Sequence, residues 1–182
     1  MILVIRFIGI MNAAIWLGAA VFFTFAAAPA FFSGEINALG LHPFWHGAMA
    51  QLVIARYFYL QYICGMIALV HLVAEWVYLG RPLQRLTLGL LIGLLCLGFM
   101  GGLWLQPKLK KLHLIKYSMS EQYKPIAIPA ADRVQAARSF GVWHGVSRVL
   151  DLVAMAGLIV YFWRVTHPTD NPRFVSANKF RS

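Results

Sequence analysis

Long apolar stretches separated by short polar segments dominate this chain. Four of them, at about 5–32, 44–78, 83–105 and 140–163, reach the length of about 20 residues that a helix needs to cross a bilayer. Pro43 and Pro82 stand where the second and third helices would begin, a position at which a missing N–H costs little. The pattern predicts an all-α fold, an integral membrane four-helix bundle in up-down-up-down order, as one domain over residues 1–166.

The polar segments outside the spans complete this domain. Residues 106–139 begin with the basic amphipathic run KLKKLHLIK, which we expect to continue as a helix along the lipid headgroups, and end in a loop. Residues 167–182 form a polar tail. The small-residue run AAAPA at 26–30 resembles a cleavage site, but the apolar run before it is too long for a secretory signal, so we expect no cleavage.

Composition agrees with a membrane protein and narrows its partners. The 182 residues are 60% hydrophobic and 12% charged, whereas soluble domains are about 25% charged. The net charge of +10 fits basic flanks beside anionic headgroups of the lipid bilayer. We expect no nucleic-acid partner, because no basic stripe outside the spans is interleaved with stacking aromatics. Lys and Arg divide seven against seven between the two faces, so orientation stays open.

Ionisable residues inside the spans are the first candidates for a site. His144, Arg148 and Asp151 follow an i, i+4, i+7 spacing and share one helical face. A charge in hydrocarbon costs ~3 kcal/mol, so such groups turn inward and pair. Arg148 can neutralise Asp151, which leaves Arg56 in need of a partner. We therefore predict a polar pocket between the second and fourth helices, or a purely structural network, formed by His46, Arg56, His144, Ser147, Arg148 and Asp151.

A short internal echo suggests two alternatives. Trp-His-Gly occurs at 45–47 and again at 143–145, so His46 and His144 should lie at similar depth on diagonal helices. Two such imidazoles are the axial ligands of a b-type haem, and the glycines beside them would leave room for a porphyrin. A metal site of His46 and His144 with His113 or His42 is another alternative. A further alternative is that each histidine simply makes a hydrogen bond to a neighbouring helix.

Other polar and small residues add less specific expectations. His71 and Glu75 lie one turn apart and can pair, and with the first polar group they allow a small-solute or ion transporter. Gly89, Gly93, Gly98 and Gly102 suit close packing in the bundle, a homo-oligomer, or contact with other subunits. Cys64 and Cys96 lie in apolar spans and are expected to be buried thiols.

Motifs that would indicate catalysis are missing from the sequence. It has no HExxH or CxxC spacing, no P-loop, no nucleophile elbow and no dinucleotide fingerprint. We therefore expect a non-enzymatic protein, such as an accessory subunit of a larger membrane complex.

Three segments resemble a known family. WLGAAVFFTFAAAPAFF at 16–32, Arg56-Tyr57-Phe58 and Trp143-His144-Gly145-Val146-Ser147 are similar to elements of the transmembrane-protein-205-like group of small four-helix membrane proteins. Its bacterial members are grouped as a domain of unknown function. The resemblance implies a four-helix integral protein, here of the bacterial inner (plasma) membrane, and no agreed activity or catalytic residues.

Overall fold

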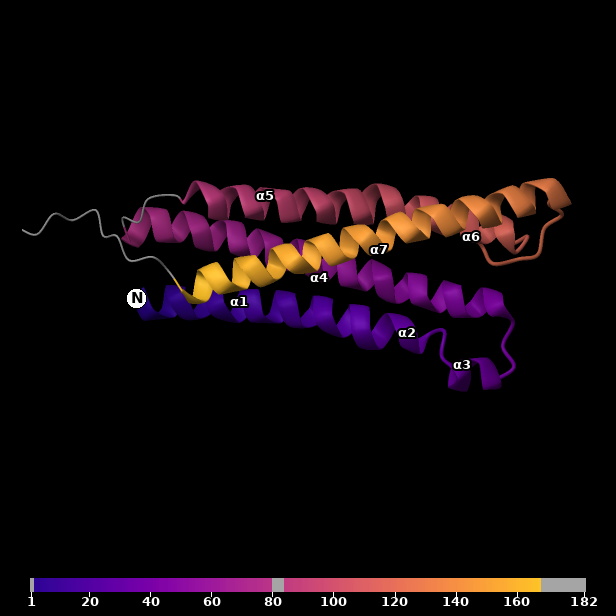
Figure 1. Ribbon diagram of the computed structural model, residues 1–182, viewed down its shortest axis with the longest axis horizontal. Helices are drawn as coiled ribbons and strands as arrows, with labels where there is room; N and C mark the ends of the chain where they lie inside the picture. Colours follow the sequence, from indigo (N-terminus) through magenta and orange to yellow (C-terminus); the bar gives the residue numbers. More distant parts are fainter. Residues whose placement is uncertain (1, 80–83, 168–182) are drawn as a thin grey trace, which may run out of the picture.

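The computed structural model describes residues 2–79 and 84–167 and is all-helical within these ranges (Figure 1). Its elements are α1 (Ile2–Phe22), η1 (Phe23–Ala27), α2 (Ala28–Ala30), α3 (Gly34–Ala38), α4 (Pro43–Leu79), α5 (Arg85–Phe99), η2 (Met100–Leu105), α6 (Gln106–Lys116) and α7 (Ala130–Thr166). In the described part of the chain, four helical stretches are long and apolar enough to cross a membrane: Leu3–Ala38, Pro43–Tyr78, Arg85–Lys116 and Ala130–Thr166. The protein is therefore an integral membrane protein.

These four stretches lie side by side along their length (Figure 1). Helix α1 packs against α4 and α7, and α5 packs against the same two helices. Helices α4 and α7 are thus separated by α1 on one side and by α5 on the other. A site between α4 and α7 must accordingly include groups from a third helix.

Small side chains and one large aromatic fill the centre of the bundle. Ala13, Ala20 and Ala68 are at most 1% exposed, and such small residues let helix backbones approach closely. Trp16 is 2% exposed, its indole N–H donates to Gln61 Oε1, and its ring meets Tyr161 edge-on at 5.8 Å. The outer faces instead carry exposed large apolar side chains, which suit contact with hydrocarbon.

The third stretch, Arg85–Lys116, differs from the prediction in the position of its basic segment. Rather than lying along the headgroups, α6 continues α5 and η2 in line and packs against α7 and α4 (Figure 1). His113 and Leu114 on α6 are buried, so its apolar side is covered by protein. At η2, Gly102 lacks the Cβ that would overlap Tyr62 and Phe58. The helix continues through Gly101 and Gly102 of η2 without a bend toward the membrane surface.

The outward face of α5 shows that a second prediction, the burial of Cys96, was wrong. Cys64 is buried in the core as predicted, but the prediction for Cys96 was wrong, because its side chain is exposed. Gly89 and Gly93 lie on that exposed side of α5, and a Cβ added to either would meet no atom within 4 Å. Gly98 and Gly102 face α4 instead, at Tyr62. The predicted start at Pro82 and the tail beyond residue 167 fall outside the described residues.

Candidate functional site

The carboxyl group of Asp151 lies at a junction of three helices. Thr24 Oγ1 donates a hydrogen bond of 2.7 Å to Asp151 Oδ2, which joins η1 to α7. Thr24 belongs to a π-helical turn, and single π-turns within α-helices occur frequently at functional sites. The neighbouring Phe23 stacks on Tyr57 of α4, with ring centroids 4.4 Å apart and planes 12° from parallel. The π-turn thus sets both a hydroxyl and a ring toward the Asp151 junction.

Helix α4 extends this junction into a hydrogen-bonded network. Tyr57 is hydrogen-bonded to Gln61 and lies within electrostatic reach of Asp151. Gln61 Oε1 also accepts from the Trp16 indole N–H on α1. Together these groups, which we call the Asp151 centre, come from α1 and η1, α4, and α7: Trp16, Thr24, Tyr57, Gln61 and Asp151. The centre therefore links one carboxyl, through the Thr24 hydroxyl, to a set of neutral polar side chains.

Two tryptophans on α7 indicate where this centre lies in the membrane. Trp143 and Trp163 are twenty positions apart, which a rise of about 1.5 Å per residue converts to about 30 Å, the thickness of the hydrocarbon core. Trp143 packs edge-on against Trp104 at 5.3 Å, and Lys108 Nζ lies 3.5 Å from the Trp143 ring centroid. Aromatic and basic side chains of this kind mark the headgroup level. Asp151, eight residues beyond Trp143, lies within the apolar region.

The structure divides the six residues of the predicted pocket. Arg56 and Arg148 are exposed on the outside of their helices. Asp151 therefore meets Thr24 on the neighbouring helix rather than Arg148 on its own helix, contrary to the predicted pair. Long guanidinium side chains on an outer face can extend to the headgroups, so neither arginine needs a buried partner. Ser147 is partly buried.

His46 and His144 belong to a second region, at the end of the bundle where α4 begins. Phe44 is fully buried there, and its carbonyl oxygen lies 3.1 Å from His113 Nε2. The His113 ring stacks on Phe44 at 5.2 Å and meets Phe140 at 5.8 Å, and Phe140 stacks on His144 at 5.6 Å. We call these residues, with Tyr117 against His113, the ring cluster.

The ring cluster occupies space that the haem alternative would need. A Cβ at Gly47 would overlap the His113 ring, whereas a Cβ at Gly145 would meet nothing within 4 Å. The space beside His46 is therefore filled by an imidazole from α6, and the matched porphyrin slot expected from the Trp-His-Gly echo does not form. Among residues 2–79 and 84–167, no three His, Cys, Asp or Glu side chains gather as metal ligands would.

Valine at Gly47 and at Gly145 should therefore have unequal effects. We expect Gly47→Val to lower the free energy of unfolding by about 1–3 kcal/mol, because the new side chain must displace the His113 ring from its stack on Phe44. Gly145→Val, its matched control in the second Trp-His-Gly, should change it by less than about 0.5 kcal/mol. Thermal unfolding in detergent measures both, and equal losses would contradict the difference in packing.

A third polar group lies toward the opposite end of the bundle. Arg164 donates from Nε to Thr87 Oγ1 at 2.8 Å and from Nη2 to Gln84 Oε1 at 2.7 Å. His71 is 7% exposed, and its ring lies directly against Gly9 of α1. Its Nε2 has no hydrogen-bond partner among the described residues, so that nitrogen does not make the predicted bond to Glu75.

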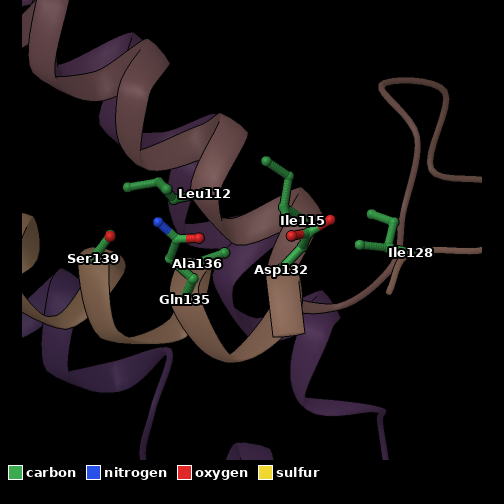
Figure 2. A pocket seen from close by; sticks show the side chains of 7 residues that line it. All are labelled: Leu112, Ile115, Ile128, Asp132, Gln135, Ala136 and Ser139. Atoms are coloured by element: carbon green, nitrogen blue, oxygen red, sulfur yellow. The ribbon is translucent and has the colours of Figure 1, made fainter. Parts of the chain in front are cut away.

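A groove lies between α6 and α7, at the end of the bundle where α7 begins (Figure 2). It measures about 380 Å³, and Ile128 from the preceding loop closes one end. Asp132, Gln135 and Ser139 supply its polar groups, and Leu112, Ile115, Ile128 and Ala136 the apolar ones. It lies beyond the Trp143 level, away from the Asp151 centre.

Sequence reasoning found Asp151 but missed the residues that contact it. Thr24 stands in a run of phenylalanine and alanine, where one hydroxyl gives no periodic signal. The residues Tyr57, Gln61, His71 and Glu75 do share one face of α4, because at 3.6 residues per turn their positions fall within about 80° of one another around the helix. That line could have indicated an inward polar face on α4.

Comparison with known proteins identifies a family that this chain matches. The model of a family described as a domain of unknown function, DUF4149, matches residues 11–118. This range includes Trp16, Thr24, Tyr57 and Gln61 but not Asp151. It supports an uncharacterised domain family, and the transmembrane-protein-205-like name stays a prediction. No curated protein and no solved structure matches the chain.

Proposed function

Because the chain belongs to the DUF4149 family, whose activity is unassigned, we propose its function from the Asp151 centre. The protein is a non-enzymatic up-down-up-down bundle of the bacterial inner membrane. Its working site is the Asp151 carboxyl, which binds and releases a proton within the membrane. The single observation that carries this proposal is the 2.7 Å hydrogen bond that the neutral Thr24 hydroxyl donates to the Asp151 carboxyl.

The energetics of an intramembrane carboxyl support this function. An ionised aspartate at the centre of a bilayer costs ~3 kcal/mol on insertion scales, and pairing with a cation normally offsets it. The hydroxyl of Thr24 donates a hydrogen bond to Asp151, and the phenol of Tyr57 lies within its electrostatic reach; neither group carries a positive charge. A carboxyl in such surroundings avoids the free-energy cost of burying a charge by taking up a proton. Ionisable groups facing a bundle interior are also the usual components of proton relays.

The chemistry of the centre favours binding over catalysis. Hydrolytic sites generally pair a nucleophile with a positioned base, or place two carboxyls together. The Asp151 centre instead combines one carboxyl with a hydroxyl, a phenol, an amide and an indole. Such a set can hold and transfer a proton, and nothing in it activates a nucleophile.

A role beside other subunits fits the outer face of α5. Gly89 and Gly93 stand four residues apart on that face with no atom within 4 Å of an added Cβ. Small residues at this spacing let a second helix approach closely in a membrane. We propose that this face joins the protein to a second copy or to other subunits of a membrane complex, and that the Asp151 centre serves that complex.

Infrared spectroscopy of the purified protein in lipid tests the proton site. At neutral pH we expect the carbonyl stretching band of a protonated carboxylic acid, and we expect Asp151→Asn to remove it. Asp132→Asn is the matched control, because Asp132 is exposed at the start of α7, outside the Asp151 centre, and its replacement should leave the band unchanged. A neutral-pH spectrum with no such band, or a band of unchanged position and area in Asp151→Asn, would refute protonation of Asp151.

A further inference from the structure

The imidazole of His46 is buried without the hydrogen bond that such a group normally has. The residue is 4% exposed, and its Nε2 has no partner among the described residues. More than nine in ten buried polar groups in proteins are bonded to protein or to ordered water. The nitrogen therefore points to a small polar species, such as water or a hydrated proton, at the inner face of α4.

His46 lies at the same end of the bundle as a line of polar groups on α7 that leads to Asp151. The ring contacts from Phe44 through His113 to Phe140 join the beginning of α4 to the beginning of α7 by way of α6, so both helices begin at the same end of the bundle. His144 stacks on Phe140 one turn further along α7. His144, Ser147 and Asp151 then follow at spacings of three and four, which is one helical face. Each step along this face is one turn, a distance that a bound water can bridge.

The opposite direction is closed by the core. Trp16 is 2% exposed and donates to Gln61, so it forms the end of the Asp151 centre that meets the apolar core. Ala68 and Leu158 of the same core cluster are at most 1% exposed. Dry, closely packed side chains of this kind leave no room for water. Proton exchange with the face of His71 would have to cross this layer.

We infer that Asp151 exchanges its proton with water at the end of the bundle that carries α3 and α6, and that His46 and His144 relay it. This inference rests on the proposed function, because it presupposes a proton at Asp151. An imidazole suits the role, since it accepts a proton on one ring nitrogen and releases one from the other. A proton that enters at His46 thus leaves toward His144, Ser147 and Asp151, and both imidazoles return to neutral.

Few other ionisable groups face this line. Tyr57 of α4 faces Asp151, whereas η1 offers the neutral Thr24. On α5, the side chains nearest to α7 at Gly157 are leucines. On α6, His113 is bonded to the Phe44 carbonyl, and Lys116 Nζ lies 5.6 Å from the Phe140 ring centroid. On α7 itself, Arg148 is exposed, but its charge lies within electrostatic reach of His144 one turn away. His46 and His144 are thus the groups placed to exchange a proton with Asp151.

Deuterium exchange at the Asp151 carboxyl tests the relay. After transfer of lipid-reconstituted protein into D₂O, the carboxylic acid band shifts as its proton is replaced, and the time course gives the exchange rate. We expect His46→Gln and His144→Gln each to slow this exchange at least about tenfold, because a positioned imidazole accelerates proton transfer by about 10²–10⁴-fold. The position of the band before transfer should not change, and imidazole added to the buffer should restore part of the rate.

His42→Gln is the matched control, because His42 is an exposed histidine at the same end of the bundle. Its exchange rate should equal that of the unmodified protein. Equal rates in His46→Gln and His144→Gln would overturn the relay and leave the proton site intact, whereas a missing band in the unmodified protein would refute the proton site itself. If His46→Gln does not fold, an unchanged rate in the half-buried His144→Gln alone overturns the relay.

Discussion

Replacement of Trp16 by alanine is expected to lower the free energy of unfolding by about 3–5 kcal/mol. The side chain is 2% exposed, so its removal leaves a cavity between α1, α4 and α7 that the surrounding alanines cannot fill. It also removes the indole N–H that donates to Gln61 Oε1. Thermal or denaturant unfolding of the detergent-solubilised protein, followed by far-UV circular dichroism, measures the loss.

Trp163→Ala is the matched control for this prediction. Trp163 is also a tryptophan of a spanning helix, but it is 64% exposed and packs on His167 at 4.0 Å near the end of α7. Its loss should change the free energy of unfolding by no more than about 1 kcal/mol. Similar losses for both tryptophans would show that Trp16 does not organise the core as described.

The second large effect is expected at the other end of the bundle. Phe44→Ala should lower the free energy of unfolding by about 3–5 kcal/mol and release α6 from α4. Phe44 is fully buried and contacts the rings of Trp45, His113, Tyr117 and Tyr123. Without it, the ring cluster loses its central member. Hydrogen exchange followed by mass spectrometry should show reduced protection of residues 106–117.

Phe25→Ala provides the comparison for Phe44→Ala. Phe25 lies in η1 and is 65% exposed on the outside of the bundle, so its removal should leave protection of α6 unchanged. If Phe44→Ala affects α6 no more than Phe25→Ala does, the ring cluster is not what holds α6 against α4.

The helices themselves were largely predictable from the sequence. Runs of apolar residues longer than a bilayer crossing predict membrane spans whatever their neighbours, since the backbone must satisfy its own hydrogen bonds in lipid. The span near 44–78 corresponds to α4 and the span near 140–163 lies within α7. Arg85 begins α5, two residues after the expected start of the third span.

The candidate site was predictable only in part, for a geometric reason. Asp151 was identified because an ionisable residue in an apolar span stands out on any scale. Its partner was misassigned to Arg148, the neighbour that sequence spacing makes visible, whereas Thr24 is 127 positions away along the chain. Contacts between helices depend on rotation and depth, which no local pattern specifies.

The sequence by itself determined that the protein crosses a membrane as helices, and that Asp151 and His46 are polar groups in need of an explanation. The tertiary structure alone decided which way each of them turns. It placed Arg56 outside, seated His113 in the space beside Gly47, and joined Asp151 to the π-turn at Thr24. The physical reason is that hydropathy acts along one chain segment, whereas packing and hydrogen bonding are settled between segments that only folding brings together.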